Sequence, residues 1–481
     1  MGTLASRELE LIRSQFAFSL RDRIVTNNAA STQPPLAVLE LLRDLSETYE
    51  NVHRGQSDAS IRTTEMFEAS FDTIAAWINA PSRRTLSMHR STTEAINAVM
   101  YSLLADFRDG DNVVTTLMEH NSDYVPWHAM CREILPRFGR HVEVRLARFD
   151  HESGELDLAH LAELVDARTK LVCCTGGSNF LGTKPPLDQV RAIADAGGYV
   201  QPDGRVGALL LVDAAQRFAS SRVDVQEMEA DFVAFSFHKL LAPFGVGVLY
   251  AREDLRETLP PFLYGGDMIA EGQVFPDRVE YNDLPWKFSA GTPNILGVIA
   301  SAQTLRLIVD LVGADPTRAW FRTDDPLEPG AVDAAMAIVA GHAASLTRQA
   351  MEGLSTIAGL RIHGASVGED RTPLVAFTVE GRSPFAIAHA LNAQGVESRA
   401  GCHCATLAHH DLGLEPAASC RVSFTVYNTP EEVDRVVAAV RRAVDAPHDF
   451  SSAGTPSTSA DRTTTPSGRA TAVAPSRFGR V

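Results

Sequence analysis

Short apolar runs alternate with longer helical patterns over the first 300 residues, and this alternation constrains the fold more than any other feature of the chain. The strand candidates are Asn112–Leu117, Val142–Leu146, Lys170–Cys174, Ala208–Val212, Asp231–Phe235 and Val246–Tyr250. The helix candidates between them are Glu94–Ala105, Leu158–Asp166 and Leu187–Ala196. Several strand candidates are continuously apolar and β-branched, which is typical of a sheet covered on both faces. The alternation predicts an α/β domain with a mainly parallel sheet.

The pattern of predicted helices and strands changes near Pro293, and the new pattern predicts a smaller α+β domain. Two Ala-rich helical stretches are followed by short strands that alternate with helices. After Ala446 the chain is rich in Ser, Thr, Pro, Gly and Ala, and such a segment cannot bury enough apolar surface to fold. We therefore expect an N-terminal helix in residues 1–20, a large domain in 21–300, a small domain in 301–447 with an inserted loop at 313–329, and a disordered tail at 448–481.

The charge balance and the apolar runs exclude several classes of protein. Lys and Arg number 44 against 60 Asp and Glu, and the resulting net charge of −16 disfavours nucleic acid as a partner. No apolar run approaches the roughly 18–20 residues that span a bilayer, so no membrane partner is expected. The N-terminus lacks the pattern of a secretory signal. The six cysteines are therefore expected to be free thiols in the cytoplasm.

Polar groups follow two neighbouring strand candidates in the stretch from Leu209 to Tyr250. One strand runs into Asp213, and the next runs into Ser236, Phe237, His238 and Lys239. Groups at the carboxyl ends of strands point into the ligand crevice of an open α/β sheet. A lysine, an acid and hydroxyl groups placed there suit pyridoxal phosphate, which needs a Schiff-base lysine and a carboxylate for its ring nitrogen. Taken singly, the lysine could be a solvated loop residue and the acid a capping residue.

The sequence then resembles a known family. The stretch VDAAQ…DFVAFSFHKL…PFGVGVLY is similar to the cofactor signature of class V aminotransferase-like enzymes, and the nearest branch is the cysteine desulfurases and selenocysteine lyases. The similarity runs from Asn27 to Thr429. It includes, in the family's order, Asn51–Gly55, Ser91–Asn97, Glu119–Asn121, Val125–Trp127, Ser178–Thr183, Ala290–Asn294 and Arg399–Ala405. The resemblance implies the fold type I architecture of aspartate aminotransferase and pyridoxal 5'-phosphate as cofactor.

The resemblance also implies roles around the cofactor ring. Lys239 would carry the internal aldimine and move the Cα proton, and Asp213 would pair with the pyridine nitrogen. Gln216 and Asn179 would lie near the ring hydroxyl. His120 would stack on the ring and shuttle protons; its alternative is a buried structural histidine.

A phosphate-binding cup is expected at the start of the helix after residue 91. Thr92 and Thr93 offer hydroxyls and free amide N–H groups there, although a plain helix cap would look the same. By resemblance, Ser236 and His238 complete the cup. Thr292 would reach it from a partner subunit, which implies a homodimer with shared active sites.

For the substrate, the resemblance points to two arginines and one cysteine. Arg421, with Arg399 as a second candidate, would clamp the α-carboxylate of an amino acid, and an exposed ion pair is the competing interpretation. Cys404 would accept sulfur as a persulfide. Its neighbours could instead bind zinc, but their C-x-C…H-H spacing is unusual for that metal, so we expect no metal site. The neighbours are Cys402, His403, His409 and His410.

Two functions are consistent with these residues. The first is a cysteine desulfurase that cleaves the C–S bond of L-cysteine through an external aldimine and a Cys404 persulfide, releases alanine and passes sulfur to an acceptor protein. The second is a C–S lyase, or another enzyme acting at Cα or Cβ, that works on a larger cysteine conjugate without using Cys404. A non-enzymatic binding role would require that cofactor binding fails. Fold alone does not separate the first two.

Overall fold

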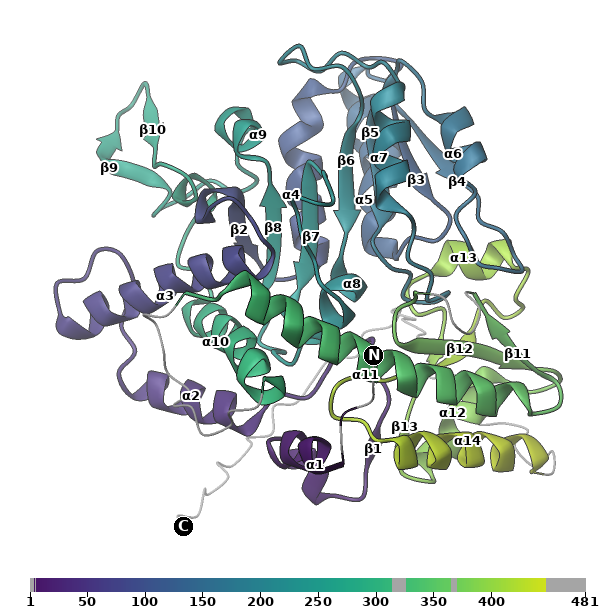
Figure 1. The fold of residues 1–481 in the computed structure, drawn as a ribbon. Helices are drawn as coiled ribbons and strands as arrows, with labels where there is room; N and C mark the ends of the chain where they lie inside the picture. Colours follow the sequence, from purple (N-terminus) through teal and green to yellow (C-terminus); the bar gives the residue numbers. More distant parts are fainter. Residues whose placement is uncertain (1–3, 5, 314–325, 365–369, 447–481) are drawn as a thin grey trace, which may run out of the picture. The chain divides into compact units, whose positions relative to one another are not determined.

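A seven-stranded sheet forms the centre of the computed structural model, which describes residues 4, 6–313, 326–364 and 370–446 (Figure 1). Its strand order is β2-β8-β7-β6-β5-β3-β4. In that order the strands are Leu86–His89, Gly247–Ala251, Phe232–Ser236, Leu209–Asp213, Thr169–Thr175, Asn112–Thr116 and Glu143–Ala147. Strand β8 runs antiparallel to both of its neighbours, and the remaining pairs of this sheet are parallel. The expected α/β class with a mainly parallel sheet is confirmed.

The central strands are buried along their whole length because both faces of the sheet are covered. Every residue of β3, β5, β6, β7 and β8 is buried. Successive side chains point to opposite faces, so Leu209 and Leu211 belong to one core cluster, whereas Leu210 and Val212 belong to the other.

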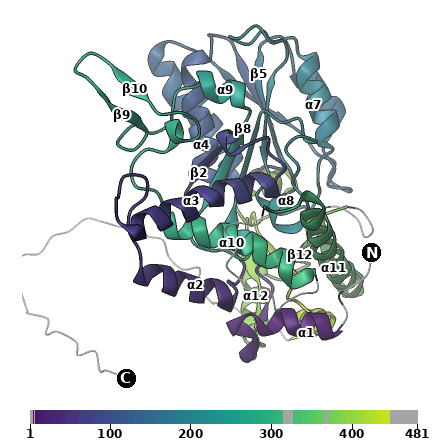
Figure 2. The same cartoon turned by 60° about the vertical axis from the view of Figure 1, so that its left-hand side comes forward.

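Helices form a layer on each face of this sheet (Figures 1 and 2). One core cluster contains residues of α4 (Thr92–Leu103), α5 (Val125–Ala129) and α9 (Glu253–Thr258). The other contains residues of α3 (Asp58–Trp77), α6 (Leu158–Leu164), α7 (Leu187–Ala196), α8 (Ala215–Ser220) and α10 (Ile295–Val312). The sheet is thus the middle of three layers.

A second, four-stranded sheet lies in the C-terminal part of the chain. Its order is β11-β12-β15-β14, formed by Leu360–His363, Leu374–Val379, Ser419–Ser423 and Arg399–Gly401, and all neighbours are antiparallel. Its core cluster includes residues of α11 (Pro329–Ser355), α12 (Pro384–Asn392) and α14 (Pro430–Asp445). The expected α+β pattern is found there.

The N-terminal segment is paired to this C-terminal region. After α1 (Ser6–Ser14) and a 3-10 turn at Ala17–Leu20, β1 (Ile24–Val25) pairs in parallel with β13 (Val396–Glu397). Asn27 then forms a bridge with Ser423 of β15. The chain continues into α2 (Leu36–Glu47). An N-terminal segment therefore lies beside strands β13 and β15.

An exposed hairpin, β9 (Ile269–Val274) and β10 (Val279–Tyr281), extends from the region after α9 (Figures 1 and 2). The sequence pattern predicted no strand there, nor at β1, β2 or β13. These strands are short or exposed, so they lack the continuous apolar pattern that marks the central strands.

Met1–Ala446 forms one compact unit, and the division into domains near residue 300 stays a prediction. The expected tail at 448–481 and most of the expected insertion at 313–329 lie outside the described residues. Contrary to the sequence expectation, α10 and α11 are long and apolar enough by length and composition to cross a membrane. Their apolar windows are 72% and 44% buried inside the protein, as core helices can be.

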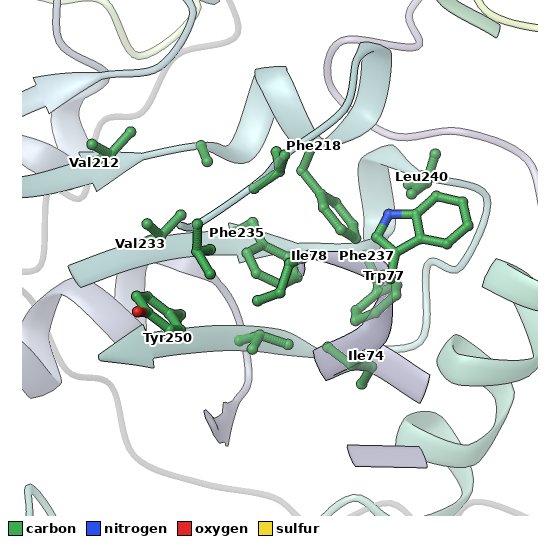
Figure 3. Close-up of a cluster of buried hydrophobic side chains, with 14 of the residues drawn as sticks. Ile74, Trp77, Ile78, Val212, Phe218, Val233, Phe235, Phe237, Leu240 and Tyr250 are labelled. Carbon is green, nitrogen blue, oxygen red and sulfur yellow. The ribbon is translucent and has the colours of Figure 1, made fainter. Parts of the chain in front are cut away.

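A cluster of aromatic side chains supports the end of β7 (Figure 3). Phe218 stacks on Phe235 with ring centroids 4.1 Å apart, and it meets Phe237 edge-on at 5.3 Å. Phe237 is fully buried and begins the 3-10 turn Phe237–Lys239. The packing of this turn therefore fixes the backbone that carries Lys239.

Candidate active site

A cavity of about 160 Å³ lies where β6 and β7 end and where residues from the C-terminal part of the chain meet them. It brings together all the predicted site residues except Gln216 and Thr292. Its walls are Ala29, Ala30, Ser91, Thr92, Thr93, His120, Ser122, Asn179, Asp213, Ala215, Ser236, His238, Lys239, Arg399, His403, Cys404 and Arg421.

One end of the cavity is formed by hydroxyl groups around the N-terminus of α4. The Thr92 amide donates to Ser236 Oγ over 2.6 Å, and the Thr92 hydroxyl lies 2.6 Å from the same oxygen. The Thr93 and Ser122 hydroxyls are 2.7 Å apart. A Cβ at Gly247 would lie 2.4 Å from the Ser91 carbonyl carbon, so only glycine lets β8 approach the helix so closely. Hydroxyls and a helix N-terminus together suit a phosphate group.

The opposed charges of Asp213 and Lys239 lie at the ends of adjacent strands. Asp213 ends β6, and its Oδ1 accepts a hydrogen bond from the Ala215 amide over 2.9 Å. Burial raises the pKa of Asp213, and the charge of Lys239 opposes that rise. Burial lowers the pKa of Lys239 to about 8, and the charge of Asp213 opposes that fall. The lysine amine is therefore much closer to neutrality than an exposed lysine.

His120 is held as a neutral ring with a defined proton position. Its Nδ1 lies 3.1 Å from the Ser122 amide nitrogen and accepts its hydrogen, so the ring proton is on Nε2. Burial, together with the charges of Lys239 and Arg421, lowers the pKa of His120 to about 3. The ring can therefore donate from Nε2 in the cavity.

Two amide side chains predicted near a ring hydroxyl have different surroundings. Asn179 Nδ2 donates to the His403 carbonyl oxygen over 2.6 Å, while its buried Oδ1 has no hydrogen-bond partner among the described residues. That oxygen is a free acceptor for a hydroxyl group. Gln216 donates to the Ala29 carbonyl over 2.9 Å and lines a neighbouring cavity of about 20 Å³, which Lys239 also lines. Its contact with a ring hydroxyl stays a prediction.

Arg399 and Arg421 face each other across β14 and β15. Arg421 is buried, and its Nη1 donates to the Asn179 carbonyl over 2.6 Å. Its Nε is buried without a partner among the described residues. Burial and the charge of Arg399 lower the pKa of Arg421 to about 9. In the described part of the chain neither arginine has a carboxylate partner within ion-pair distance, so an exposed ion pair does not explain them. Two arginines without a counter-ion favour an anionic ligand.

Cys404 enters the cavity from a backbone in the left-handed region. His403 and Cys404 have φ values of 52° and 58°, and the Cys404 carbonyl accepts from the Asn121 amide over 2.6 Å. Such φ values are uncommon outside glycine. The half-buried thiol is thus anchored through its own backbone to the turn that follows His120.

A chain of hydrogen bonds sets the tautomer of His403. His409 Nδ1 lies 2.9 Å from the Ala405 carbonyl and must donate to it, so His409 Nε2 is an acceptor. Ser419 Oγ lies 3.0 Å from His409 Nε2 and 3.0 Å from His403 Nε2. The hydroxyl therefore donates to His409 and accepts from His403. His403 Nδ1 is left as a buried lone pair without a partner among the described residues.

Some residues of the cavity were not predicted from the sequence, and two predicted residues, Gln216 and Thr292, are not among its walls. The hydroxyl of Ser122 could have been noticed, because Ser122 directly follows the motif Glu119–Asn121. Ala29 and Ala30 offered no chemical signal of their own. Thr292 is exposed and lies outside the cavity walls. No group of three or more His, Cys, Asp or Glu side chains is arranged for a metal ion in the part of the chain that the structure describes.

Comparisons with known proteins agree with this geometry. A family model described as aminotransferase class-V matches residues 24–322 and 332–436. A probable cysteine desulfurase of Halobacterium salinarum is 35% identical over 91% of this chain and 96% of its own length. A cysteine desulfurase of Dickeya dadantii is 35% identical over 86% of this chain and 90% of its own. The apo structure of a cysteine desulfurase from Thermococcus onnurineus is 28% identical with a TM-score of 0.78, covering 92% of this chain and 99% of that one.

Proposed function

The chain belongs to the aminotransferase class-V family, and on that basis we propose that it is a cysteine desulfurase that takes sulfur from L-cysteine. It is a pyridoxal-phosphate-dependent enzyme. The observation that carries the proposal is that Lys239, Arg421 and Cys404 line one small cavity. A base, a carboxylate clamp and a sulfur nucleophile are the groups that such a reaction requires.

The side chains around the cavity fit the cofactor. Thr92, Thr93 and Ser236 would hold its phosphate, and Asp213 would hold the proton on its ring nitrogen. The unpartnered Asn179 Oδ1 would accept the ring hydroxyl. Joined to the amine of the substrate, pyridoxal phosphate would draw electron density from the substrate Cα and so make the Cα proton removable.

The chain's own groups would then act on the substrate in turn. Arg421, supported by Arg399, binds the α-carboxylate and so fixes the orientation of the amino acid. Lys239 Nζ takes the proton from the substrate Cα, since its lowered pKa leaves part of the amine neutral near neutral pH. His120, which carries its proton on Nε2, is placed to return protons.

Sulfur transfer is assigned to Cys404. Its thiolate Sγ forms an S–S bond to the substrate sulfur as the substrate Cβ–S bond breaks, and the bonding electron pair stays with the carbon skeleton. Protons delivered to Cβ and Cα complete alanine. The balance is L-cysteine plus enzyme thiol giving L-alanine plus enzyme persulfide. An acceptor protein in the cytoplasm would then receive the sulfur.

A homodimer completes this proposal. Thr292 is exposed in a single subunit, and in a dimer it would reach the phosphate site of the partner. Leu263 and Tyr264 are also exposed, with 53% and 60% of their surface accessible. They precede Gly266, whose carbonyl accepts a hydrogen bond over 2.8 Å from the amide of Gly291, next to Thr292. Exposed apolar groups gathered in one region favour a protein contact, and a second copy of this chain is the partner that supplies Thr292.

Product analysis with L-cysteine tests the function. We expect the wild-type enzyme to release alanine, and Cys404→Ala to lose sulfur transfer while keeping the cofactor's visible absorbance. The control Cys402→Ala should keep both properties. Pyruvate as the main product, with Cys404→Ala nearly as active as wild type, would instead identify a β-eliminating C–S lyase.

A further inference from the structure

Two carboxyl groups lie buried beside the cavity without a counter-ion. Glu119 follows β3, and Asp123 ends the 3-10 turn Asn121–Asp123. Their side chains are 1% and 0% exposed. Neither makes an ion pair among the described residues, and the proposed function gives neither a role. An unpaired buried carboxylate is costly, so the pair needs a physical explanation.

The hydrogen bonds of the pair leave one unsatisfied oxygen on each carboxyl. Glu119 Oε1 accepts from the Thr116 hydroxyl over 2.7 Å and from the Thr175 amide over 3.0 Å. Asp123 Oδ1 accepts from Trp127 Nε1 over 3.1 Å. Glu119 Oε2 and Asp123 Oδ2 receive no hydrogen from any other described group. The two carboxyl groups lie close enough for a side-chain hydrogen bond between them, and two ionised carboxylates would have no hydrogen to give.

We propose that Glu119 and Asp123 share one proton at neutral pH and that this proton closes the turn that holds His120. The pair brackets His120 at both ends of the turn. Within the turn, the Asp123 amide donates to the His120 carbonyl over 2.8 Å, and the Ser122 amide donates to the His120 ring. Glu119 and Asp123 are thus positioning residues that act through His120.

The charges around the pair favour retention of the proton. Burial raises the pKa of both carboxyls, and the negative charge of Asp213 raises both further. Asp213 is near because Thr175, whose amide donates to Glu119, pairs with Asp213 in the register of β5 and β6. The charge of Lys239 lowers the pKa of Asp213 and so favours the negative charge of that carboxylate.

The other titratable groups packed against the pair supply no positive charge. Cys173 and Cys174 on β5 are buried thiols, and burial raises their pKa values well above the ordinary range. They are therefore uncharged. A shared proton is therefore what remains to satisfy the two unpartnered carboxyl oxygens.

The proposal predicts a definite sign for the pH dependence of stability. In the unfolded chain both carboxyls lose their protons near pH 4, whereas the folded pair keeps one. The folded state then binds more protons, so this pair makes stability fall as pH rises towards the raised pKa. In Asp123→Asn the amide Nδ2 supplies a permanent hydrogen to Glu119, and Oδ1 still accepts from Trp127. That variant should lack this fall.

The experiment compares thermal unfolding of full-length wild type, Asp123→Asn and Glu119→Gln from about pH 5.5 to about pH 8.5. The difference in Tm between each amide variant and wild type should increase by about 1–2 °C for each unit by which the pH is raised. Asp231→Asn is the matched control. Asp231 is a buried acid that forms ion pairs with Arg191, Arg205 and Arg252. Its substitution should lower Tm, and the Tm difference from wild type should not increase with pH in this way.

Infrared spectroscopy supplies a second readout. The band of a protonated carboxylic acid should be present in wild type and absent from both amide variants, and either variant suffices if the other fails to fold. Parallel Tm profiles, or a band that survives both substitutions, would overturn the proposal. Both measurements need neither substrate nor Cys404, so their failure is distinct from failure of the proposed function.

Discussion

Lys239 lies under two opposing influences, burial that favours its neutral amine and the charge of Asp213 that favours its ammonium form. The balance matters because only the neutral amine can attack the aldehyde of pyridoxal phosphate. With the pKa lowered to about 8, the neutral fraction rises about tenfold per pH unit below pH 8 and then levels off.

We therefore expect the apo-protein to capture pyridoxal phosphate covalently at a rate that follows this fraction. Rapid mixing with detection of the visible absorbance measures the rate. Lys239→Ala, mixed in the same way and treated with borohydride, should carry no label at this peptide. A rate that keeps rising towards the ordinary lysine pKa near 10.4 would contradict the assignment.

Ser419 is the second residue whose removal has a specific expected result. Ser419→Ala breaks the hydrogen-bond chain between His409 and His403, so His403 should no longer be held with its lone pair on Nδ1. Nitrogen NMR of the histidine side chains should show the tautomer change. The buried polar atoms left unpaired should lower the free energy of unfolding by about 1–3 kcal/mol. Ser423→Ala, a buried hydroxyl of the same strand, should leave the tautomer unchanged.

Among the elements, the turn Phe237–Lys239 depends on the aromatic cluster below it. Phe237→Ala would leave a cavity among buried rings and should lower the free energy of unfolding by about 3–5 kcal/mol. Because the turn carries Lys239, affinity for the cofactor should fall as well. Denaturant titration and cofactor titration measure the two effects. Phe385→Ala, a phenylalanine that is 51% exposed, should change neither appreciably.

The elements that sequence could predict are those whose pattern is local. Strands β5 to β8 each contain a run of apolar residues, and the polar groups at the ends of β6 and β7 come directly after such runs. Other contacts join residues far apart in sequence. They are the hydrogen bond from Asn121 to Cys404, the pairing of β1 with β13, and the hydrogen bonds of the Ser419 hydroxyl with His403 and His409. Such contacts depend on packing, which composition and periodicity do not encode. Resemblance to a family supplied Cys404, Arg399 and Arg421; spacing alone did not.

For the protein as a whole, assembly decides whether Thr292 contributes to the site. Mixing Lys239→Ala subunits with Thr292→Glu subunits should restore activity, since each hybrid dimer would contain one intact site. With random pairing, about a quarter of all sites are intact, so about a quarter of wild-type activity should return. Alanine release after refolding the mixture measures this. Either variant alone should stay inactive, and an active monomer in sedimentation would contradict the shared site.

The pairing of β1 with β13, and of Asn27 with Ser423, has a consequence for biosynthesis. Ala29 and Ala30 leave the ribosome early, whereas Cys404 and Arg421, which line the same cavity, are made hundreds of residues later. The strands of the large sheet are made before β15, so the cavity lacks the walls formed by the C-terminal part of the chain until β15 has left the ribosome. Translation that stops before Arg399 thus yields a polypeptide that has Lys239 and the hydroxyls of the phosphate site but neither of the arginines proposed to bind the amino acid.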